Sequence, residues 1–254
     1  MKLAIMQPYF MPYIGYFQAI KAVDKYILYS NLTFIKEAWM NRNRVRLKDG
    51  RTCYILVPLV HKSSNALISE TMIDNTKHWR KDLLNTIYFG YKKSECFDEV
   101  YPLMEELLSV EADRLADLNS LTIKGIAAYL DITTEIESDN TRYLELEDRL
   151  NTIENGYASF PYMEKTKPIK KVARVLEICR CEGCDFFVNA IGGRELYSKD
   201  EFSEYGISLN FVQTNEITYP QYGYECDPKL SIIDVLMHNG KEGTKKLLDE
   251  YVLV

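Results

Sequence analysis

Residues 1–30, MKLAIMQPYFMPYIGYFQAIKAVDKYILYS, decide the fold. The apolar run of residues 3–6 stops at a Gln-Pro pair, as a buried strand does. Apolar side chains then recur with helical spacing over residues 15–23, and residues 25–30 read as a second strand. A strand, a helix and a strand in such a short stretch form a βαβ unit, which predicts a parallel sheet with a right-handed crossover.

The next segment predicts a β-hairpin at about residues 43–59. Residues 43–47 and 52–59 are strand-like and flank an Asp-Gly pair, which favours a tight turn. Residues 67–73 read as a further strand. Residues 78–130 read as a mainly helical insertion, because Leu and Val recur there at helical spacing.

The second half of the chain alternates strands with helices. We expect strands at residues 132–136, 185–189 and 207–212, and helices at residues 172–181 and 199–205. From residue 230 to residue 251 we expect two helices, separated at Asn239 and Gly240. The whole pattern predicts a single α/β domain over residues 1–254, with a mostly parallel sheet built from distant segments.

The composition is that of an ordinary globular protein, with 27% charged and 46% hydrophobic residues. No apolar run approaches the roughly 20 residues needed to span a bilayer, and Gln7 and Pro8 come too early for a signal-peptide core. We therefore expect a cytoplasmic protein without membrane insertion. Cys179, Cys181 and Cys184 are close in sequence, but a helix would turn the first two to different sides, so we predict no metal site.

The net charge of −6 is unevenly distributed along the chain. Residues 1–50 hold eight Lys and Arg against three Asp and Glu, a net charge of +5 that leaves −11 for the remainder. A chain with this balance is a poor binder of nucleic-acid polymers. The local positive charge instead suits one small anion, so we expect a phosphorylated small molecule as the ligand.

The turn after the first strand carries the densest group of aromatic and polar side chains. Ligands of open parallel sheets bind beyond the carboxyl ends of the strands, and the N-terminus of the following helix attracts phosphate. The predicted substrate-binding residues here are Gln7, Pro8, Tyr9, Tyr13, Gly15 and Tyr16. The alternative is a rigid aromatic loop that packs into the core.

The first strand of the predicted hairpin carries a cationic face. Side chains alternate along a strand, so Arg42, Arg44, Arg46 and Lys48 share one side, where they repel one another unless an anion or acidic partner offsets them. Arginine also suits bidentate recognition of phosphate. The predicted binding residues of this segment are Lys36, Trp39, Asn41, Arg42, Asn43, Arg44 and Arg46. The alternative is a solvated edge strand that is protected by its charge.

Later segments add weaker signals for binding and catalysis. The further binding residues that we predict are Asn189, Gly192, Gly193, Tyr197, Tyr219, Gln221 and Ser231, although turns and a helix cap explain them equally well. The chain contains no GxGxxG, Walker, HExxH or GxSxG motif. Asp234 and His238 lie four residues apart on one helical face, so Asp234 could orient the His238 ring, and either residue is a candidate catalytic base.

These clusters together resemble the WbqC-like protein family. The segments that carry the resemblance are QPYFMPYIGYFQAI, FIKEAWMNRNRVRL, FVNAIGGRELY, TYPQ and LSIIDVLMHNG, which cover nearly the whole chain. Members are similar to products of gene clusters for O-antigen and other bacterial surface polysaccharides. The resemblance therefore implies a transferase that moves an acyl or aminoacyl group to a nucleotide-linked amino sugar.

A looser resemblance is to nucleotidylyltransferases with a His-x-Gly-His loop on a Rossmann-like sheet. The matching loop here, from Tyr13 to Tyr16, keeps Gly15 but replaces both histidines with tyrosines. Two alternatives to the transferase therefore stay open: a nucleotidylyltransferase-like enzyme, and a non-catalytic protein that binds a sugar nucleotide or acts as a scaffold. The transferase function requires a nucleotide sugar and an acyl or aminoacyl donor, and no cofactor is certain. A homodimer also remains possible as the assembly of the chain.

Overall fold

The opening βαβ unit forms as the sequence predicts. The computed structural model describes residues 1–60, 66–153 and 156–254. Strand β1 (Lys2–Met6) leads through helix α1 (Ile14–Lys21) to strand β2 (Lys25–Leu28). The two strands are parallel, and their register pairs Leu3 with Lys25 and Met6 with Leu28.

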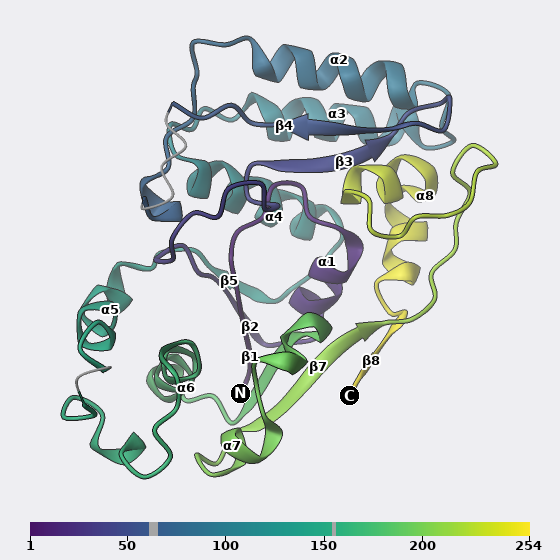
Figure 1. Ribbon diagram of the computed structural model, residues 1–254. Coiled ribbons are helices and arrows are strands. Elements are labelled where there is room, and N and C mark those ends of the chain that lie inside the picture. Colours follow the sequence, from purple (N-terminus) through teal and green to yellow (C-terminus); the bar gives the residue numbers. More distant parts are fainter. Residues whose placement is uncertain (61–65, 154–155) are drawn as a thin grey trace.

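The central sheet draws its strands from both ends of the chain (Figure 1). Within the described ranges it has six strands in the order β5-β2-β1-β6-β7-β8. The later strands are β5 (Glu135–Glu137), β6 (Phe186–Ala190), β7 (Ser208–Thr214) and β8 (Tyr251–Leu253). All neighbours pair in parallel except β8, which is antiparallel to β7. The predicted mostly parallel α/β sheet is thus confirmed.

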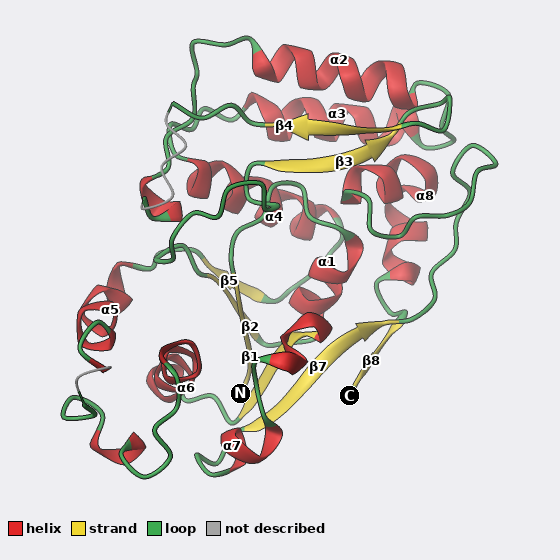
Figure 2. Ribbon diagram, viewed as in Figure 1, coloured by secondary structure: helices red, strands yellow, loops and turns green. Residues whose placement is uncertain are grey.

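Helices cover both faces of this sheet, because its strands bury side chains on both sides (Figure 2). Leu3 and Ala4, neighbours on β1, belong to two different hydrophobic clusters. Ala4 joins the cluster that contains residues of α1 and α8, whereas Leu3 joins the cluster that contains residues of α5, α6 and α7. The bounds of these helices are α5 (Leu144–Leu150), α6 (Lys170–Glu182), α7 (Lys199–Ser203) and α8 (Ile232–Leu247).

The predicted hairpin and helical insertion also form. Strands β3 (Arg42–Arg46) and β4 (Thr52–Leu56) make a separate antiparallel pair. The insertion contains α2 (Trp79–Tyr91), α3 (Phe97–Ser109) and α4 (Leu115–Tyr129). In Figure 1 the hairpin lies between α2 and the turn that follows β1.

One predicted strand is wrong, and so is the predicted end of the last helix. Residues 67–73 form a 3₁₀ turn (Ile68–Glu70) with isolated bridges, because the Glu70 carboxylate accepts the Leu67 N–H and favours a local turn. The predicted final helix ends at Leu247, and the chain finishes as β8. The predicted interruption of the last helical region is confirmed, since Gly240 has a φ of 59° and a ψ of −168°. In the described segments, no helix is long and apolar enough to cross a bilayer.

Candidate functional site

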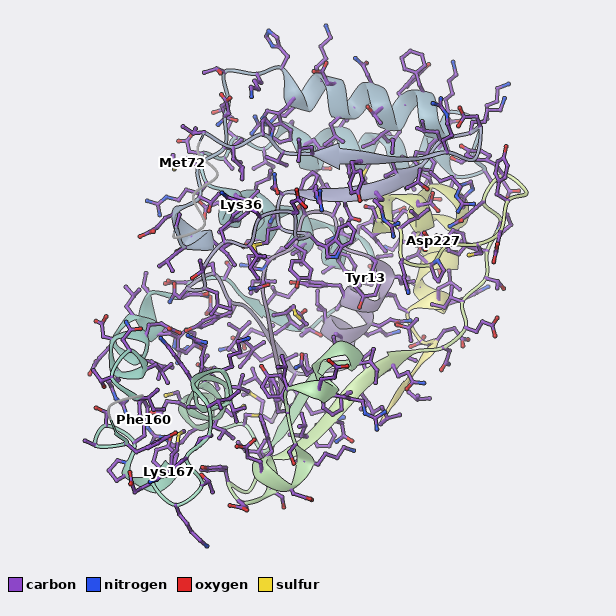
Figure 3. All side chains as sticks on the ribbon, viewed as in Figure 1. Tyr13, Lys36, Met72, Phe160, Lys167 and Asp227 are labelled. Carbon is purple, nitrogen blue, oxygen red and sulfur yellow. The ribbon has the colours of Figure 1, made fainter. Side chains whose placement is uncertain are left out.

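A cavity of about 440 Å³ lies where three parallel strands end. Its lining follows β1, β6 and β7, with additions from the hairpin and from the loop that precedes α8. The lining residues are Tyr9, Pro12, Tyr13, Trp39, Asn43, Arg44, Ile191, Gln213, Thr214, Asn215, Pro228 and Lys229. Figure 3 shows Tyr13 beneath the hairpin, with Asp227 to its right.

This position is the topological switch point of the sheet. The chain moves from β1 to β2 on one side, and from β6 to β7 on the other side. The connections therefore diverge between β1 and β6, and they leave a crevice at the carboxyl ends of the strands. Ligands of open α/β sheets bind in this crevice.

Backbone contacts hold the first loop in an unusual conformation. Met11 has a φ of 43°, which costs free energy for a residue with a side chain. The Asn43 Nδ2 group donates to the carbonyls of Phe10 (3.0 Å) and Met11 (2.7 Å), and Ser231 Oγ donates to the same Met11 carbonyl at 2.8 Å. These bonds fix the segment between Tyr9 and Tyr13, so that both rings line the cavity.

Gly15 allows the first loop to pack against the end of β7. A Cβ atom at this position would lie 2.4 Å from the Tyr13 ring and 2.9 Å from Thr214 Oγ1. Any larger residue would therefore displace two walls of the cavity. The buried Tyr16 hydroxyl donates to the Gln7 carbonyl at 2.9 Å, so this hydrogen bond joins helix α1 to the start of the loop.

The arginines of β3 share one face, as the sequence predicts. Arg42, Arg44 and Arg46 are partly exposed, whereas Asn43 and Val45 between them are buried. Each guanidinium lies over a different aromatic ring: Arg42 over Tyr54 at 4.9 Å, Arg44 over Trp39 at 5.6 Å and Arg46 over Tyr224 at 6.0 Å. Such pairs hold planar cations in place beside apolar surfaces.

The three arginines nevertheless have different partners. Arg42 donates to the Glu37 carbonyl, and Arg46 donates to the Glu225 carbonyl at 2.7 Å. These two side chains therefore tie loops to the hairpin. Arg44 lines the cavity, with its Nη2 atom 3.7 Å from an Asp227 carboxylate oxygen. Arg44 is thus the β3 cation best placed to meet an anionic ligand.

The Asp234 carboxylate organises a buried network at the start of α8. It accepts hydrogen bonds from Tyr91 Oη (2.6 Å), Tyr219 Oη (2.9 Å) and Gln221 Nε2 (2.8 Å). Burial raises the pKa of Asp234 above its ordinary value, although the hydrogen bonds from Tyr91 and Tyr219 and the nearby His238 act in the opposite direction.

Gln221 connects this network to the rim of the cavity. Its Oε1 accepts from the Asp227 N–H at 2.9 Å, and its Nε2 donates to the Asp227 carbonyl at 3.2 Å. Asp227 is followed directly by Pro228 and Lys229, which line the cavity. The buried network therefore sets the position of a cavity wall.

His238 lies one turn beyond Asp234 and packs among tyrosine rings. Its ring centroid is 4.7 Å from that of Tyr222 and 5.9 Å from that of Tyr91. Burial lowers the pKa of His238 below its ordinary value, so the neutral ring is favoured. Neither Asp234 nor His238 lines the cavity.

The chain is similar to known proteins over nearly its whole length. The model of the WbqC-like protein family matches residues 7–246. The chain belongs to this family. The WbqC-like chain is also 27% identical, over 95% of its own length and 95% of the other protein, to the uncharacterized protein Rv1507c of Mycobacterium tuberculosis. No solved structure matches it.

The remaining predicted residues of this WbqC-like chain lie around the cavity or away from it. Asn41 is buried and donates to the Val57 carbonyl at 2.9 Å, and Lys36 is exposed in the loop before Trp39. Asn189 accepts the Ala190 N–H, and Gly193 leaves room for the Asn189 side chain. Gly192 and Gly193 belong to the 3₁₀ turn Ile191–Glu195 after β6, and Tyr197 packs edge-on against Phe187 and Phe202.

Sequence reasoning missed several cavity residues. The missed residues are Pro12, Ile191, Gln213, Thr214, Asn215, Pro228 and Lys229. The signal that could have found three of them is the end of the strand predicted at residues 207–212, because polar residues that follow a parallel strand reach the ligand edge of a sheet.

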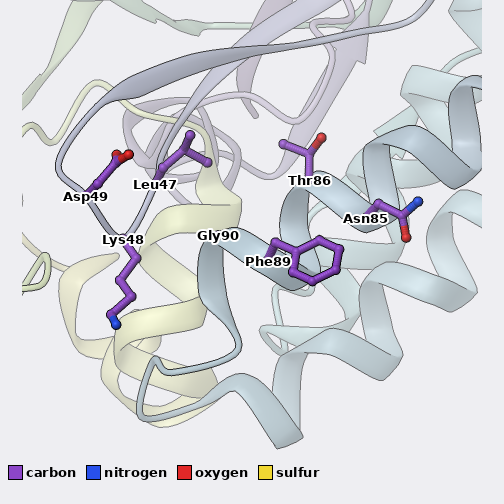
Figure 4. Close-up of a pocket in the computed structure, with 7 residues that line it drawn as sticks. All are labelled: Leu47, Lys48, Asp49, Asn85, Thr86, Phe89 and Gly90. Atoms are coloured by element: carbon purple, nitrogen blue, oxygen red, sulfur yellow. The ribbon is translucent and has the colours of Figure 1, made fainter.

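A second hollow of about 620 Å³ lies between the hairpin turn and α2 (Figure 4). It is wider and more open than the cavity at the strand ends. Its lining residues are Leu47, Lys48, Asp49, Asn85, Thr86, Phe89 and Gly90. They lie away from the carboxyl ends of β1, β6 and β7, so we place the functional site in the smaller cavity.

Proposed function

We propose that this WbqC-like chain is a transferase that adds an acyl or aminoacyl group to a nucleotide-linked amino sugar. The observation that carries the proposal is the cavity at the switch point, where aromatic and cationic side chains share one wall. A nucleotide-linked sugar combines a planar base, a diphosphate and a hydroxylated ring. The cavity offers groups that suit each of these parts.

The diphosphate would lie against Arg44 and Lys229. Arg44 Nη2 is 3.7 Å from the Asp227 carboxylate, a long ion pair that a phosphate could replace with shorter, charge-assisted bonds. The Arg44 Nε atom, like those of Arg42 and Arg46, is shielded from solvent and finds no hydrogen-bond partner in the described part of the chain. Both features leave hydrogen-bonding capacity on Arg44 for an anion.

The base and the sugar would lie against rings and amides. Tyr9, Tyr13 and Trp39 present faces on which a base or sugar ring can stack. Burial raises the pKa values of Tyr9 and Tyr13, so their hydroxyls stay protonated and can donate to sugar oxygens near neutral pH. Gln213 and Asn215 add neutral side chains at the end of β7.

In the transfer step the amine of the sugar would form an amide bond with the acyl carbon, the bond between the acyl group and its carrier would break, and the carrier would leave. This step requires a base that takes a proton from the attacking amine. Asp234 and His238 are the proposed groups, and Asp234 is bonded to Gln221, whose side chain also binds Asp227 at the cavity rim. His238 suits this role because burial favours its neutral form, which can accept a proton.

One observation favours a second candidate, a non-catalytic protein that binds a sugar nucleotide. Among the described residues that line the cavity there is no Asp, Glu, His or Cys. The two functions share the ligand and differ in chemistry. Mass spectrometry of the nucleotide sugar after incubation with acyl donors separates them, because only a transferase produces a heavier sugar.

The experiment that tests the shared binding step is a thermal-shift screen with UDP-, GDP- and dTDP-sugars. A ligand that binds the folded state raises the unfolding temperature by mass action. We expect Arg44→Ala to weaken binding by about tenfold to a hundredfold, as for lost hydrogen bonds to a charged group. Arg51→Ala is the matched control, because Arg51 lies in the same hairpin and pairs with Asp49 outside the cavity.

Two results would contradict the proposal. If Arg44→Ala binds the ligand as tightly as the wild type does, Arg44 does not hold the diphosphate. If the chain releases pyrophosphate from a nucleoside triphosphate in a magnesium-dependent reaction, it is instead a nucleotidylyltransferase-like enzyme.

A further inference from the structure

Large apolar side chains gather on the surface beside the cavity. Ile35 is 55% exposed, Trp39 38%, Tyr54 57% and Leu56 45%. Tyr54 and Leu56 lie on one face of β4, where the strand register places them opposite Arg44 and Arg42. Single exposed apolar residues are common, whereas a contiguous group of this kind indicates an interaction surface.

Arg42 connects β4 with the loop that carries Ile35 and Trp39. Its guanidinium lies over the Tyr54 ring and also donates to the Glu37 carbonyl. Glu37 belongs to the turn in which the Ala38 N–H bonds to the Ile35 carbonyl. We call this surface the docking rim and define it by Ile35, Lys36, Trp39, Arg42, Tyr54 and Leu56.

The docking rim is cationic in a chain that is otherwise acidic. The rim itself carries Lys36 and Arg42, and Arg44 and Arg46 follow on the same face of β3. Between residues 35 and 46, Glu37 is the one acidic residue. The net charge of residues 1–50 is +5, whereas that of the whole chain is −6. An anionic surface would therefore attract the rim and repel the rest of the protein, which selects one orientation.

We propose that the docking rim binds a lipid surface that carries anionic headgroups. Trp39 and Tyr54 are the ring types that prefer the boundary between water and lipid, and Ile35 and Leu56 can enter the acyl region. Lys36 and Arg42 would meet the headgroup phosphates while their stems stay in the apolar layer. A symmetric contact between two copies fits less well, because it would bring the same cations of both copies together.

Docking in this way places the cavity at the membrane surface. Trp39 belongs to the rim and also lines the cavity, and Arg44 lies over its ring. A docked chain would therefore open its cavity toward molecules that are held in the membrane surface. This inference goes beyond the proposed function and does not depend on it, since the rim residues Tyr54 and Leu56 lie outside the cavity wall.

The test is flotation of the protein with lipid vesicles. One set of vesicles contains equal parts of phosphatidylcholine and phosphatidylglycerol, and the other contains phosphatidylcholine alone. We expect the wild type to float with the anionic vesicles and not with the phosphatidylcholine vesicles. Added salt should release the protein from the anionic vesicles. The Tyr54→Ser/Leu56→Ser double variant should bind at least about tenfold more weakly, because it loses the apolar contacts.

Two further variants make the result specific. Ile35→Ser alters the rim from a separate segment, so it should also weaken vesicle binding. Leu144→Ser is the matched control, because Leu144 is 50% exposed at the start of α5 and lies outside the rim. Unfolding temperatures and nucleotide-sugar binding, both measured without vesicles, should stay at wild-type values in the double variant.

Several outcomes would overturn the docking proposal. The proposal is wrong if the wild type does not float with anionic vesicles at low salt. It is also wrong if the double variant binds these vesicles as tightly as the wild type and the Leu144→Ser control do. A dimer that the double variant abolishes, with no vesicle binding, would assign the rim to a second copy. A lack of nucleotide-sugar binding would reject the proposed function alone, because the flotation assay contains no such ligand.

Discussion

Replacing Asn43 with Ala should cost far more stability than replacing Asn41 with Ala. Both asparagines are 4% exposed and lie close together at the start of the hairpin. Asn43 makes three hydrogen bonds: its Nδ2 donates to the carbonyls of Phe10 and Met11, and its Oδ1 accepts the Arg44 N–H at 2.8 Å. The Asn41 side chain makes one hydrogen bond within the described residues, to the Val57 carbonyl at 2.9 Å.

The difference can be estimated from these bonds. Each intramolecular hydrogen bond contributes about 1 kcal/mol net, and a buried group left without a partner costs about 1–3 kcal/mol. Asn43→Ala should therefore lower the free energy of unfolding by about 3–4 kcal/mol, against about 1–2 kcal/mol for Asn41→Ala. Because both changes remove the same atoms, the difference of about 2 kcal/mol reflects the hydrogen bonds.

Urea denaturation of both variants measures this difference directly. The slopes should match that of the wild type, so that the midpoints report stability. In a thermal melt, the unfolding temperature of Asn43→Ala should be about 4–8 °C below that of Asn41→Ala, at the sensitivity expected for a chain of this size. Equal losses for the two variants would refute the reasoning that Asn43 anchors the first loop.

Three further outcomes follow from the structure. Asp227→Asn keeps a side-chain oxygen that can accept the Lys229 N–H, but it removes the negative charge beside Arg44. Titration calorimetry should therefore show a several-fold gain in affinity for the anionic ligand. Gly50→Ala should cost at least about 1 kcal/mol in urea denaturation, because Gly50 has a φ of 82°, whereas Gly192→Ala adds a methyl group in open space and should cost less. The folded pKa of His238 lies below its ordinary value of 6.5, so the unfolded chain binds more protons below that pH. The contribution of His238 to the free energy of unfolding should thus be fully present above pH 6.5 and should decrease as the pH falls below it. In His238→Leu this part of the pH dependence of stability should disappear.

Local patterns were sufficient to predict most of the framework. The βαβ unit and the hairpin depend on spacing and on turn residues within about 30 residues, so the sequence carries their signals directly. The helical spacing of Cys179 and Cys181 likewise predicts different sides, and Cys179 is indeed buried whereas Cys181 is exposed. Periodicity of this kind reports on local geometry and not on distant partners.

The errors arise where a distant partner decides the structure. The end of the chain forms β8 because it pairs with β7 and because Gln18 on α1 binds the carbonyls of Leu247 and Glu250. A local sequence pattern cannot predict that this segment binds a side chain more than 200 positions away in the sequence. The same limit hid Pro228 and Lys229, because no strand that the sequence predicts ends beside them.

The three arginines of β3 show how equivalent sequence positions acquire different functions. Alternation along the strand correctly places them on one face, and the charge argument treats them as one anion site. Folding then supplies backbone carbonyls to Arg42 and Arg46, whereas Arg44 remains on the cavity wall. The pattern predicts the face, and the loops that pack on it determine which cation remains for a ligand.

The polar residues in the family segments act mainly on the backbone of the cavity loops. Asn43 and Ser231 bind the carbonyl of Met11, and Gln221 binds both backbone groups of Asp227. An apolar side chain of similar size cannot make these bonds, and it would leave buried carbonyls without donors. Substitutions at such positions should therefore lower the affinity for a ligand without removing a ligand contact, because the rings and cations of the wall would lose their places.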